Sequence, residues 1–385
     1  MSVWPLPRII FRELSSIEET RPVALLTTDD TWTVLGSQLN LPVIIQAEPA
    51  RQTRDLFTYL ADNLPHQVQA IYVIGQGAPL MAGKVVAARN RVPLVVIPTA
   101  LDSDAAISPV ARLVEVDEDG TRVVWEETGP ASEVIIDWGI IQAAPPDQRG
   151  AGIVDVLSVV TGLLDWRYAA QKGRNLTGQR FSPWAAGVAA GLASQAIKSA
   201  AAIGQGNRDA LRTLLDLMMT AVQLSNQLGH TRACQGSEHY LAQVLASIAP
   251  EVPHSALVGP CLLLVSALHG QPPTALREAL EHAGVRLDQV RPTDVRLVLD
   301  ALPDHLDAYD FPYSILNDID PESETVAQAL EAAGLAIEPE TWEVPSDTGA
   351  MLAVEAPGEP EAELDETRPA DQPEDDLGPE QSFNG

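Results

Sequence analysis

One set of residues in this sequence has the types and placement that metal chemistry needs. A carboxylate and two imidazoles, those of Asp155, His239 and His254, lie near the expected starts of three helices. Together they offer three ligands to a divalent metal ion and leave a coordination position open, as a Lewis-acid catalyst requires. Spacing alone does not select them, because the chain has other histidines: His66, His230, His269, His282 and His305.

Two loops could bind a ligand beside such a metal. Gly75-Gln76-Gly77 lies between an apolar run and a helix-like segment, so its backbone N–H groups could face a pyrophosphate. A turn with two glycines is also common without any ligand. Residues 98–108 form a second loop after the next apolar run. Ligands bind at the carboxyl ends of parallel strands in open sheets. With two such loops at one edge, a ligand-binding site and turns without a ligand are equally supported.

The first 145 residues must supply the elements that position these loops. Short, continuous apolar runs indicate strands buried on both faces of a parallel sheet. We expect strands at residues 23–27, 42–46, 70–74, 93–97 and 133–137, crossover helices at 50–64 and 78–90, and a hairpin of 110–116 with 121–126 that turns at 117–120. The fold class predicted is α/β, with a Rossmann-like parallel sheet domain at the N-terminus.

After residue 146 the sequence becomes rich in Ala, Leu and Gln, with apolar residues at helical spacing. We expect helices at residues 153–170, 184–202, 208–228, 238–248, 257–268 and 274–283. This pattern predicts an α/β domain at 1–147, an all-helical domain at 148–345 and a separate tail at 346–385. A cleft between the first two is the natural place for a site.

Charge limits the kinds of partner. The chain has 24 Lys and Arg against 53 Asp and Glu, a net charge of −29, which disfavours nucleic acid as a partner. Residues 346–385 carry twelve Asp and Glu against one basic residue, Arg368, and few aromatic or β-branched residues. We expect this tail to be disordered, as a solubilising appendage or an acidic interaction segment.

The remaining composition indicates a soluble, cytoplasmic protein. Two cysteines, Cys234 and Cys261, give neither a disulfide framework nor a zinc ribbon. No signal peptide is expected at the start, which is short in apolar residues and contains prolines. The longest charge-free apolar run, around residues 256–268, is shorter than a membrane span and contains Pro260. We therefore expect no membrane span.

An ordered series of short motifs over residues 8–316 resembles the dehydroquinate synthase-like, iron-containing alcohol dehydrogenase superfamily. The nearest resemblance is to the sn-glycerol-1-phosphate dehydrogenase family. The motifs are Gly75-Gln-Gly77 with Lys84, Pro98-Thr99 with Ser103-Asp104-Ala105, Asp155 to Thr161 with Asp165-Trp166, Arg232 with Gly236-Ser-Glu-His239, His254 with Val258, and Tyr313-Ser-Ile-Leu316. Their order and spacing give the resemblance its specificity.

The resemblance implies NAD or NADP in the first domain and zinc, or another divalent ion, in the second. It assigns the metal to Asp155, His239 and His254, with His254 preferred to His269 by the register of the following helix. Asp104 takes a place beside the substrate hydroxyls as a catalytic residue. Apart from the resemblance, we expect Arg232 or Lys198 to contact a substrate phosphate. The expected cofactor contacts are Asp29, Gly75, Gln76, Gly77, Lys84, Thr99 and Ser103.

Five positions depart from the family pattern: Gln76 replaces a glycine, Met81 an aspartate, Gln243 a histidine, and Ser255-Ala256 a Gly-Glu pair. The expected function is metal-dependent, NAD(P)-linked interconversion of dihydroxyacetone phosphate and sn-glycerol 1-phosphate. Two alternatives stay open: a non-catalytic relative with a degraded cofactor loop, and an enzyme of the same superfamily for a polyol or sugar phosphate. The expected partner is a small phosphorylated substrate, and homo-oligomerisation is left open.

Overall fold

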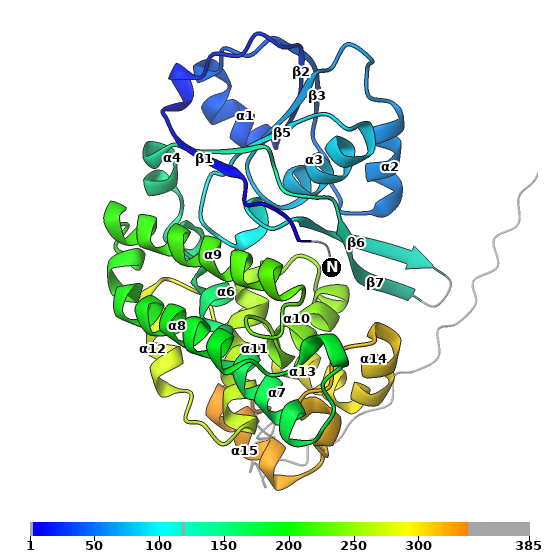
Figure 1. Cartoon of the computed structure of the whole chain (residues 1–385), viewed down its shortest axis with the longest axis vertical. Coiled ribbons are helices and arrows are strands. Elements are labelled where there is room, and N and C mark those ends of the chain that lie inside the picture. The colour runs from blue at the N-terminus through cyan, green and yellow to red at the C-terminus, as the bar shows by residue number, and fades with distance from the viewer. Residues whose placement is uncertain (1–2, 118–119, 338–385) are drawn as a thin grey trace, which may run out of the picture. The chain divides into compact units, whose positions relative to one another are not determined.

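A six-stranded parallel sheet forms the N-terminal part of the computed structural model, which describes residues 3–117 and 120–337 (Figure 1). The strand order is β1-β8-β5-β4-β2-β3, and every neighbouring pair is parallel. The strands are β1 (Arg8–Phe11), β2 (Val23–Leu26), β3 (Val43–Ala47), β4 (Ala70–Ile74), β5 (Leu94–Ile97) and β8 (Glu133–Ile136). The predicted strands are present, and β1 is an addition that pairs with β8 at the edge of the sheet.

The central strands are continuous apolar runs because both of their faces are buried. Every residue of β2, β4 and β5 is buried, and alternate residues enter two hydrophobic clusters, one on each face of the sheet. Helices α1 (Asp29–Leu35), α2 (Arg54–Asp62) and α3 (Gly77–Asn90) connect consecutive strands. Short α1 was not expected from the sequence.

A two-stranded antiparallel hairpin follows β5. It consists of β6 (Val110–Asp117) and β7 (Gly120–Glu127), and Arg112 pairs with Trp125 across it. Its tip at residues 118–119 is outside the described part of the chain. The hairpin packs against α3 on one side and against α10 on the other, so it lies beside both the sheet and the helices.

From residue 138 to 337 the described chain has helices and no strands. They are α4 (Trp138–Ala143), α5 (Pro146–Arg149), α6 (Ile153–Leu157), α7 (Val159–Gln171), α8 (Pro183–Gly204), α9 (Arg208–Leu228), α10 (Ser237–Ile248), α11 (His254–Leu268), α12 (Thr274–His282), α13 (Pro292–Asp300), α14 (Leu302–Tyr309) and α15 (Glu324–Ala333). The predicted fold class, a parallel α/β sheet followed by a helical part, is confirmed. The expected helix at 153–170 is divided at Ser158.

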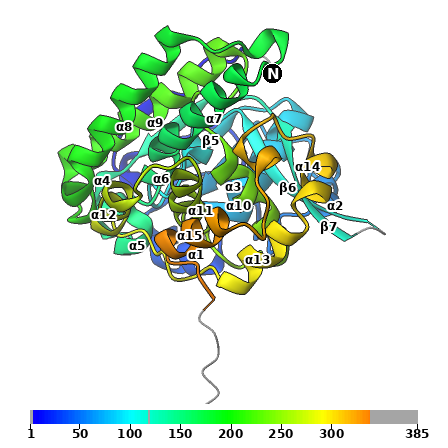
Figure 2. The same ribbon diagram turned by 90° about the horizontal axis from the view of Figure 1, so that it is seen from below.

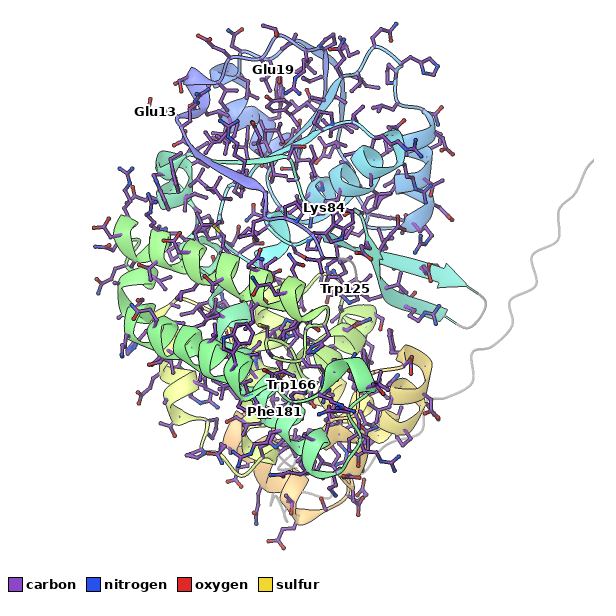
Figure 3. All side chains as sticks on the ribbon, in the orientation of Figure 1. Glu13, Glu19, Lys84, Trp125, Trp166 and Phe181 are labelled. Atoms are coloured by element: carbon purple, nitrogen blue, oxygen red, sulfur yellow. The ribbon has the colours of Figure 1, made fainter. Side chains whose placement is uncertain are left out.

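Helix α11 forms the core of the helical part. Thirteen of its fifteen residues are buried, and it packs against α6, α7, α10, α12 and α15 (Figure 2). Trp166 of α7 is also fully buried, close to Phe181 (Figure 3). This core fixes the N-terminal ends of α6, α10 and α11, where the metal-ligating types of side chain lie.

The described residues form one compact unit, and the predicted acidic tail at 346–385 is outside them. The division between an α/β domain at 1–147 and a helical domain at 148–345 remains a prediction. One described helix, α8, has the length and hydropathy of a membrane span. Core helices of soluble proteins pass the same test, so the helix gives no assignment.

Candidate metal centre and cofactor cleft

A cleft of about 1290 Å³ lies between the carboxyl edge of the sheet and the helices. Its walls come from both parts of the described chain, including α1, the loop after β5, the hairpin, α6, α10 and the start of α11. Nine of the predicted site residues line it: Gly75, Gln76, Gly77, Thr99, Ser103, Asp104, Asp155, His239 and His254. The cleft therefore brings the glycine loop and the proposed metal ligands into one space.

Asp155, His239 and His254 converge on one point of this cleft. One potential ligand atom from each residue lies within 4.8 Å of the other two. His254 Nε2 is 2.8 Å from Asp155 Oδ1, and His239 Nε2 is 3.5 Å from the same oxygen. Each residue lies in the first turn of its helix, α6, α10 or α11. Three segments far apart in the sequence thus supply one cluster of ligand atoms.

Glycine 152 lets the loop after β5 approach α6. A Cβ atom at this position would lie 2.9 Å from the Leu101 carbonyl oxygen and 3.0 Å from the Ser103 nitrogen. Close contact here allows the Asp104 backbone N–H to donate to Asp155 Oδ2 over 2.8 Å. That hydrogen bond fixes one carboxylate oxygen and leaves the other, Oδ1, directed at the two imidazoles.

Glu238 orients the imidazole of His239 from behind. This carboxylate is fully buried, and its Oε1 lies 2.9 Å from His239 Nδ1. Its two oxygens also accept hydrogen bonds from the Gly236 N–H and the Thr161 hydroxyl, each over 2.7 Å. A carboxylate bonded to the far nitrogen of a histidine fixes the ring and its tautomer, as in many metal sites. The second nitrogen, Nε2, then faces Asp155.

The charges of this cluster shift the pKa values of its members. Burial alone would raise the pKa of Asp155, but the charge and hydrogen bond of His254, together with nearby His239, hold it below its ordinary value. For His239, burial acts to lower the pKa, yet the Asp155 and Glu238 carboxylates beside its ring raise it to about 10. Burial and the nearby Asp155 charge raise the pKa of Asp104 to about 6. The site is therefore a concentrated, coupled set of charges.

The donor set fits a divalent metal ion. His239 Nε2 is buried and has no hydrogen-bond partner, which normally costs free energy. A cation between this nitrogen, His254 Nε2 and Asp155 Oδ1 would satisfy it. Two imidazole nitrogens and one carboxylate oxygen are a ligand set used for catalytic zinc, with a further position left for substrate.

The glycine loop has the backbone geometry of a phosphate-binding turn. Gly75 and Gly77 have φ of 118° and 60°, values that favour glycine, and Gly77 begins the 14-residue helix α3. No side chain caps this helix, so N–H groups of its first turn remain available for an anion. The Gln76 side chain accepts a hydrogen bond from the Thr99 hydroxyl, which holds it against the end of β5.

Two predicted cofactor contacts, Lys84 and Asp29, lie outside the cleft lining. Lys84 is buried, and its ammonium donates to the carbonyls of Ser108 and Val110, so it ties α3 to the start of β6 rather than lining the cleft (Figure 3). Asp29 is exposed and outside the cleft lining; its neighbour on α1, Asp30, lines the cleft instead.

Neither residue assigned to a substrate phosphate reaches the cleft. Arg232 is 2% exposed and its Nη2 donates to the carbonyl of Tyr313, behind the cleft wall. Lys198 is exposed on α8 and is not among the lining residues. The sequence analysis missed Arg112 of β6, which does line the cleft. The alternation of β6, with Ala111 and Leu113 buried on its other face, is the signal that could have found it.

Gln243, one turn after His239, holds the hairpin against α10. Its side chain donates to the Val123 carbonyl over 2.7 Å and accepts from Trp125 Nε1 over 3.2 Å. The family histidine expected here is therefore replaced by a residue that closes one side of the cleft.

A second aspartate–histidine pair lies in the same helical part. Asp165 Oδ1 is 2.9 Å from His269 Nε2, and both side chains are buried. The two oxygens of Asp165 also accept backbone N–H groups of Ile315 and Ser237. Neither residue lines the cleft.

Comparison with known proteins finds a matching family model and similar sequences. The family model described as iron-containing alcohol dehydrogenase matches residues 14–145. A glycerol-1-phosphate dehydrogenase [NAD(P)+] from Methanothrix thermoacetophila is 28% identical over 267 residues, 69% of this chain and 72% of that protein. The enzyme of the same name from Hyperthermus butylicus is 27% identical over 270 residues, 68% of this chain and 75% of that protein.

Solved structures agree with these likenesses at the level of the fold. A probable glycerol dehydrogenase from Sinorhizobium meliloti matches with a TM-score of 0.62 and 17% identity, over 87% of this chain and 98% of that one. A sulfoacetaldehyde reductase from Bifidobacterium kashiwanohense, solved with NAD⁺, matches with a TM-score of 0.61 and 14% identity, over 88% of this chain and all of that one. The sequence and fold likenesses agree, and the chain is similar to iron-containing alcohol dehydrogenases.

Proposed function

We propose that this protein is a metal-dependent, NAD(P)-linked dehydrogenase that interconverts dihydroxyacetone phosphate and sn-glycerol 1-phosphate. The observation that carries the proposal is the convergence of Asp155, His239 and His254 on one point of the cleft that also contains the glycine loop. The names of the sequence relatives support the choice of substrate and cofactor.

Both groups that the reaction needs have residues suited to hold them. Asp155, His239 and His254 would hold the cation, and the first turn of α3 with Gly75 and Gly77 would face the cofactor pyrophosphate. When bound, the cation supplies a Lewis acid for a carbonyl oxygen and the nicotinamide supplies or accepts a hydride.

The chain's own residues orient the substrate and manage its proton. Asp104 lines the cleft beside Asp155, so its carboxyl group is placed to hydrogen-bond a substrate hydroxyl. Because burial and the Asp155 charge raise its pKa to about 6, this carboxyl group can hold or release a proton near neutral pH. The hydrogen bond between Trp125 and Gln243 fixes the hairpin to α10 at the wall of the cleft.

A direct assay of nicotinamide absorbance tests the proposal. Purified protein with zinc, dihydroxyacetone phosphate and NADH or NADPH should consume the reduced nicotinamide. The matched control is Asp155→Asn, which keeps the size of the side chain and removes its charge. No turnover above background by metal-loaded wild-type protein with either cofactor would refute the proposed function.

A further inference from the structure

Arg112 stands out among the residues that line the cleft. On β6 it alternates with Ala111 and Leu113, which are buried in the core, so its own side chain faces the cleft. No other Lys or Arg of residues 3–117 and 120–337 lines this cleft. The acidic residues of the same walls are Asp30, Asp102, Asp104, Asp137, Asp155 and Glu251.

The guanidinium of Arg112 lacks a countercharge. Nearby arginines are paired: Arg54 contacts Glu115 and Glu126, and Arg122 contacts Glu115. Arg112, in contrast, forms no ion pair with any described residue, and its Nε donates only to the neutral Gln52 side chain over 3.4 Å. Burial lowers the pKa of Arg112, as expected for a cation partly removed from water without a partner.

The residue that contacts the Arg112 backbone is neutral. The sulfur of Met81 on α3 accepts the Arg112 backbone N–H over 3.2 Å. This neutral thioether adds no countercharge to the guanidinium. A desolvated, unpaired guanidinium gains most from a doubly charged, bidentate anion such as a phosphate monoester.

The neighbours of Arg112 place it between the glycine loop and the metal ligands. Its cross-strand partner Trp125 donates to Gln243, one turn after His239. On the other side, the Gln52 amide nitrogen lies 4.0 Å from the position that a Cβ of Gly77 would take. The N–H groups of α3 already suit the cofactor pyrophosphate, which leaves Arg112 for a second phosphate group.

We propose that Arg112, supported by Gln52, binds the phosphate group of the substrate. This inference rests on the proposed function for the identity of the substrate. It replaces Arg232 and Lys198, neither of which lines the cleft, with the basic residue that does.

Steady-state kinetics of metal-loaded Arg112→Gln tests the assignment. Losing a charge-assisted hydrogen bond should raise KM for dihydroxyacetone phosphate by about 10- to 100-fold. Turnover of unphosphorylated dihydroxyacetone and the Kd for NADH should stay unchanged. Gln52→Glu should also raise KM for dihydroxyacetone phosphate although Arg112 is intact, because it adds a carboxylate beside the guanidinium. Arg122→Gln, which alters a paired arginine of the same hairpin, is the matched control and should have no effect.

A binding measurement separates this inference from the proposed function. Calorimetric titration with inorganic phosphate needs no turnover, and Arg112→Gln should bind phosphate at least 10-fold more weakly than wild type at equal metal loading. Weaker phosphate binding by Arg112→Gln, in a protein that shows no turnover, would refute the proposed dehydrogenase function and support the phosphate site. Equal KM and equal phosphate affinity in both proteins would overturn the site. So would a higher Kd for NADH with unchanged KM, because Arg112 would then serve the cofactor.

Discussion

Two aspartate–histidine pairs in the helical part have nearly the same contact distance and different surroundings. His254 lies 2.8 Å from Asp155, and His269 lies 2.9 Å from Asp165. The Asp165 pair is closed, because both side chains are buried and the carboxylate also accepts the backbone N–H groups of Ile315 and Ser237. The Asp155 pair faces the cleft, and a third donor, His239 Nε2, points to it without a hydrogen bond.

The difference shows what makes such a pair a candidate metal site. Contact between a carboxylate and an imidazole is common to both places. Only the Asp155 pair adds a third ligand atom and access to a substrate-sized cleft. The Asp165 pair instead joins α7, the start of α10 and the segment at Ile315, which is a structural role.

The largest expected effect comes from replacing His254 and His269 by alanine, one at a time. His254→Ala should lose bound zinc and at least about 10³-fold in kcat/KM, because Lewis-acid stabilisation is worth several kcal/mol. His269→Ala should still bind one zinc ion per chain. Metal analysis after gel filtration and the nicotinamide assay measure both. Zinc retained by His254→Ala and lost by His269→Ala would show that the metal site is at the Asp165–His269 pair and not at the Asp155–His254 pair.

The second effect is on stability. Asp165→Ala should lower the free energy of unfolding by about 3–5 kcal/mol, because it leaves His269 and two backbone N–H groups without their buried partner. Denaturant unfolding monitored by circular dichroism measures the loss. Metal binding should persist where the variant is folded. An unchanged unfolding midpoint would show that the closed pair is not structural.

Glu238→Gln gives a third, smaller effect. The amide keeps the shape of the side chain but weakens the hold on His239 Nδ1, and loss of such a partner typically costs 10- to 100-fold in metal affinity or activity. Competition with a chromophoric chelator gives the zinc Kd. An affinity equal to that of wild type would mean that Glu238 does not position the ligand.

The smallest effect is a pH dependence of the metal-free protein. Burial acts to lower the pKa of His239, but Asp155 and Glu238 raise it to about 10 from an ordinary 6.5. The stability from this raised pKa is full below about pH 6.5 and is lost as the pH rises toward 10, by at most about 1.4 kcal/mol between pH 7 and 8. The free energy of unfolding of His239→Gln should change less with pH across this range. Identical slopes would contradict the assignment.

Local sequence pattern predicted most of the fold for a physical reason. The strands of the sheet interior are buried on both faces, so their apolar runs are continuous, and the long helices repeat apolar residues at helical spacing. Strand β1 was missed because its four residues form a strand through pairing with β8, more than 120 residues away. No local signal contains that pairing.

The site shows the same limit in its side chains. Asp155, His239 and His254 could be chosen only through the family resemblance, since nothing local distinguishes His254 from His269. Asp29 was predicted to contact the cofactor, but its neighbour Asp30 lines the cleft. Successive residues of a helix point about 100° apart, so an error of one residue changes which side chain faces the cleft.

The arginines depend on tertiary packing in a further way. Arg232 has the chemistry of a phosphate ligand but is enclosed by the segment around Tyr313. For Arg112, the alternation of β6 indicates the face of the strand, but only the packing of the hairpin shows that this face lines the cleft.

Stepwise return of zinc to metal-stripped protein tests the central claim most directly. Dihydroxyacetone phosphate and NADH or NADPH are present throughout, and reduced nicotinamide is followed by absorbance. If Asp155, His239 and His254 hold the catalytic ion, activity should rise in proportion to zinc and level off at one ion per chain, while Asp155→Asn stays at background. Full activity in the stripped protein, or none at saturating zinc, would contradict the account.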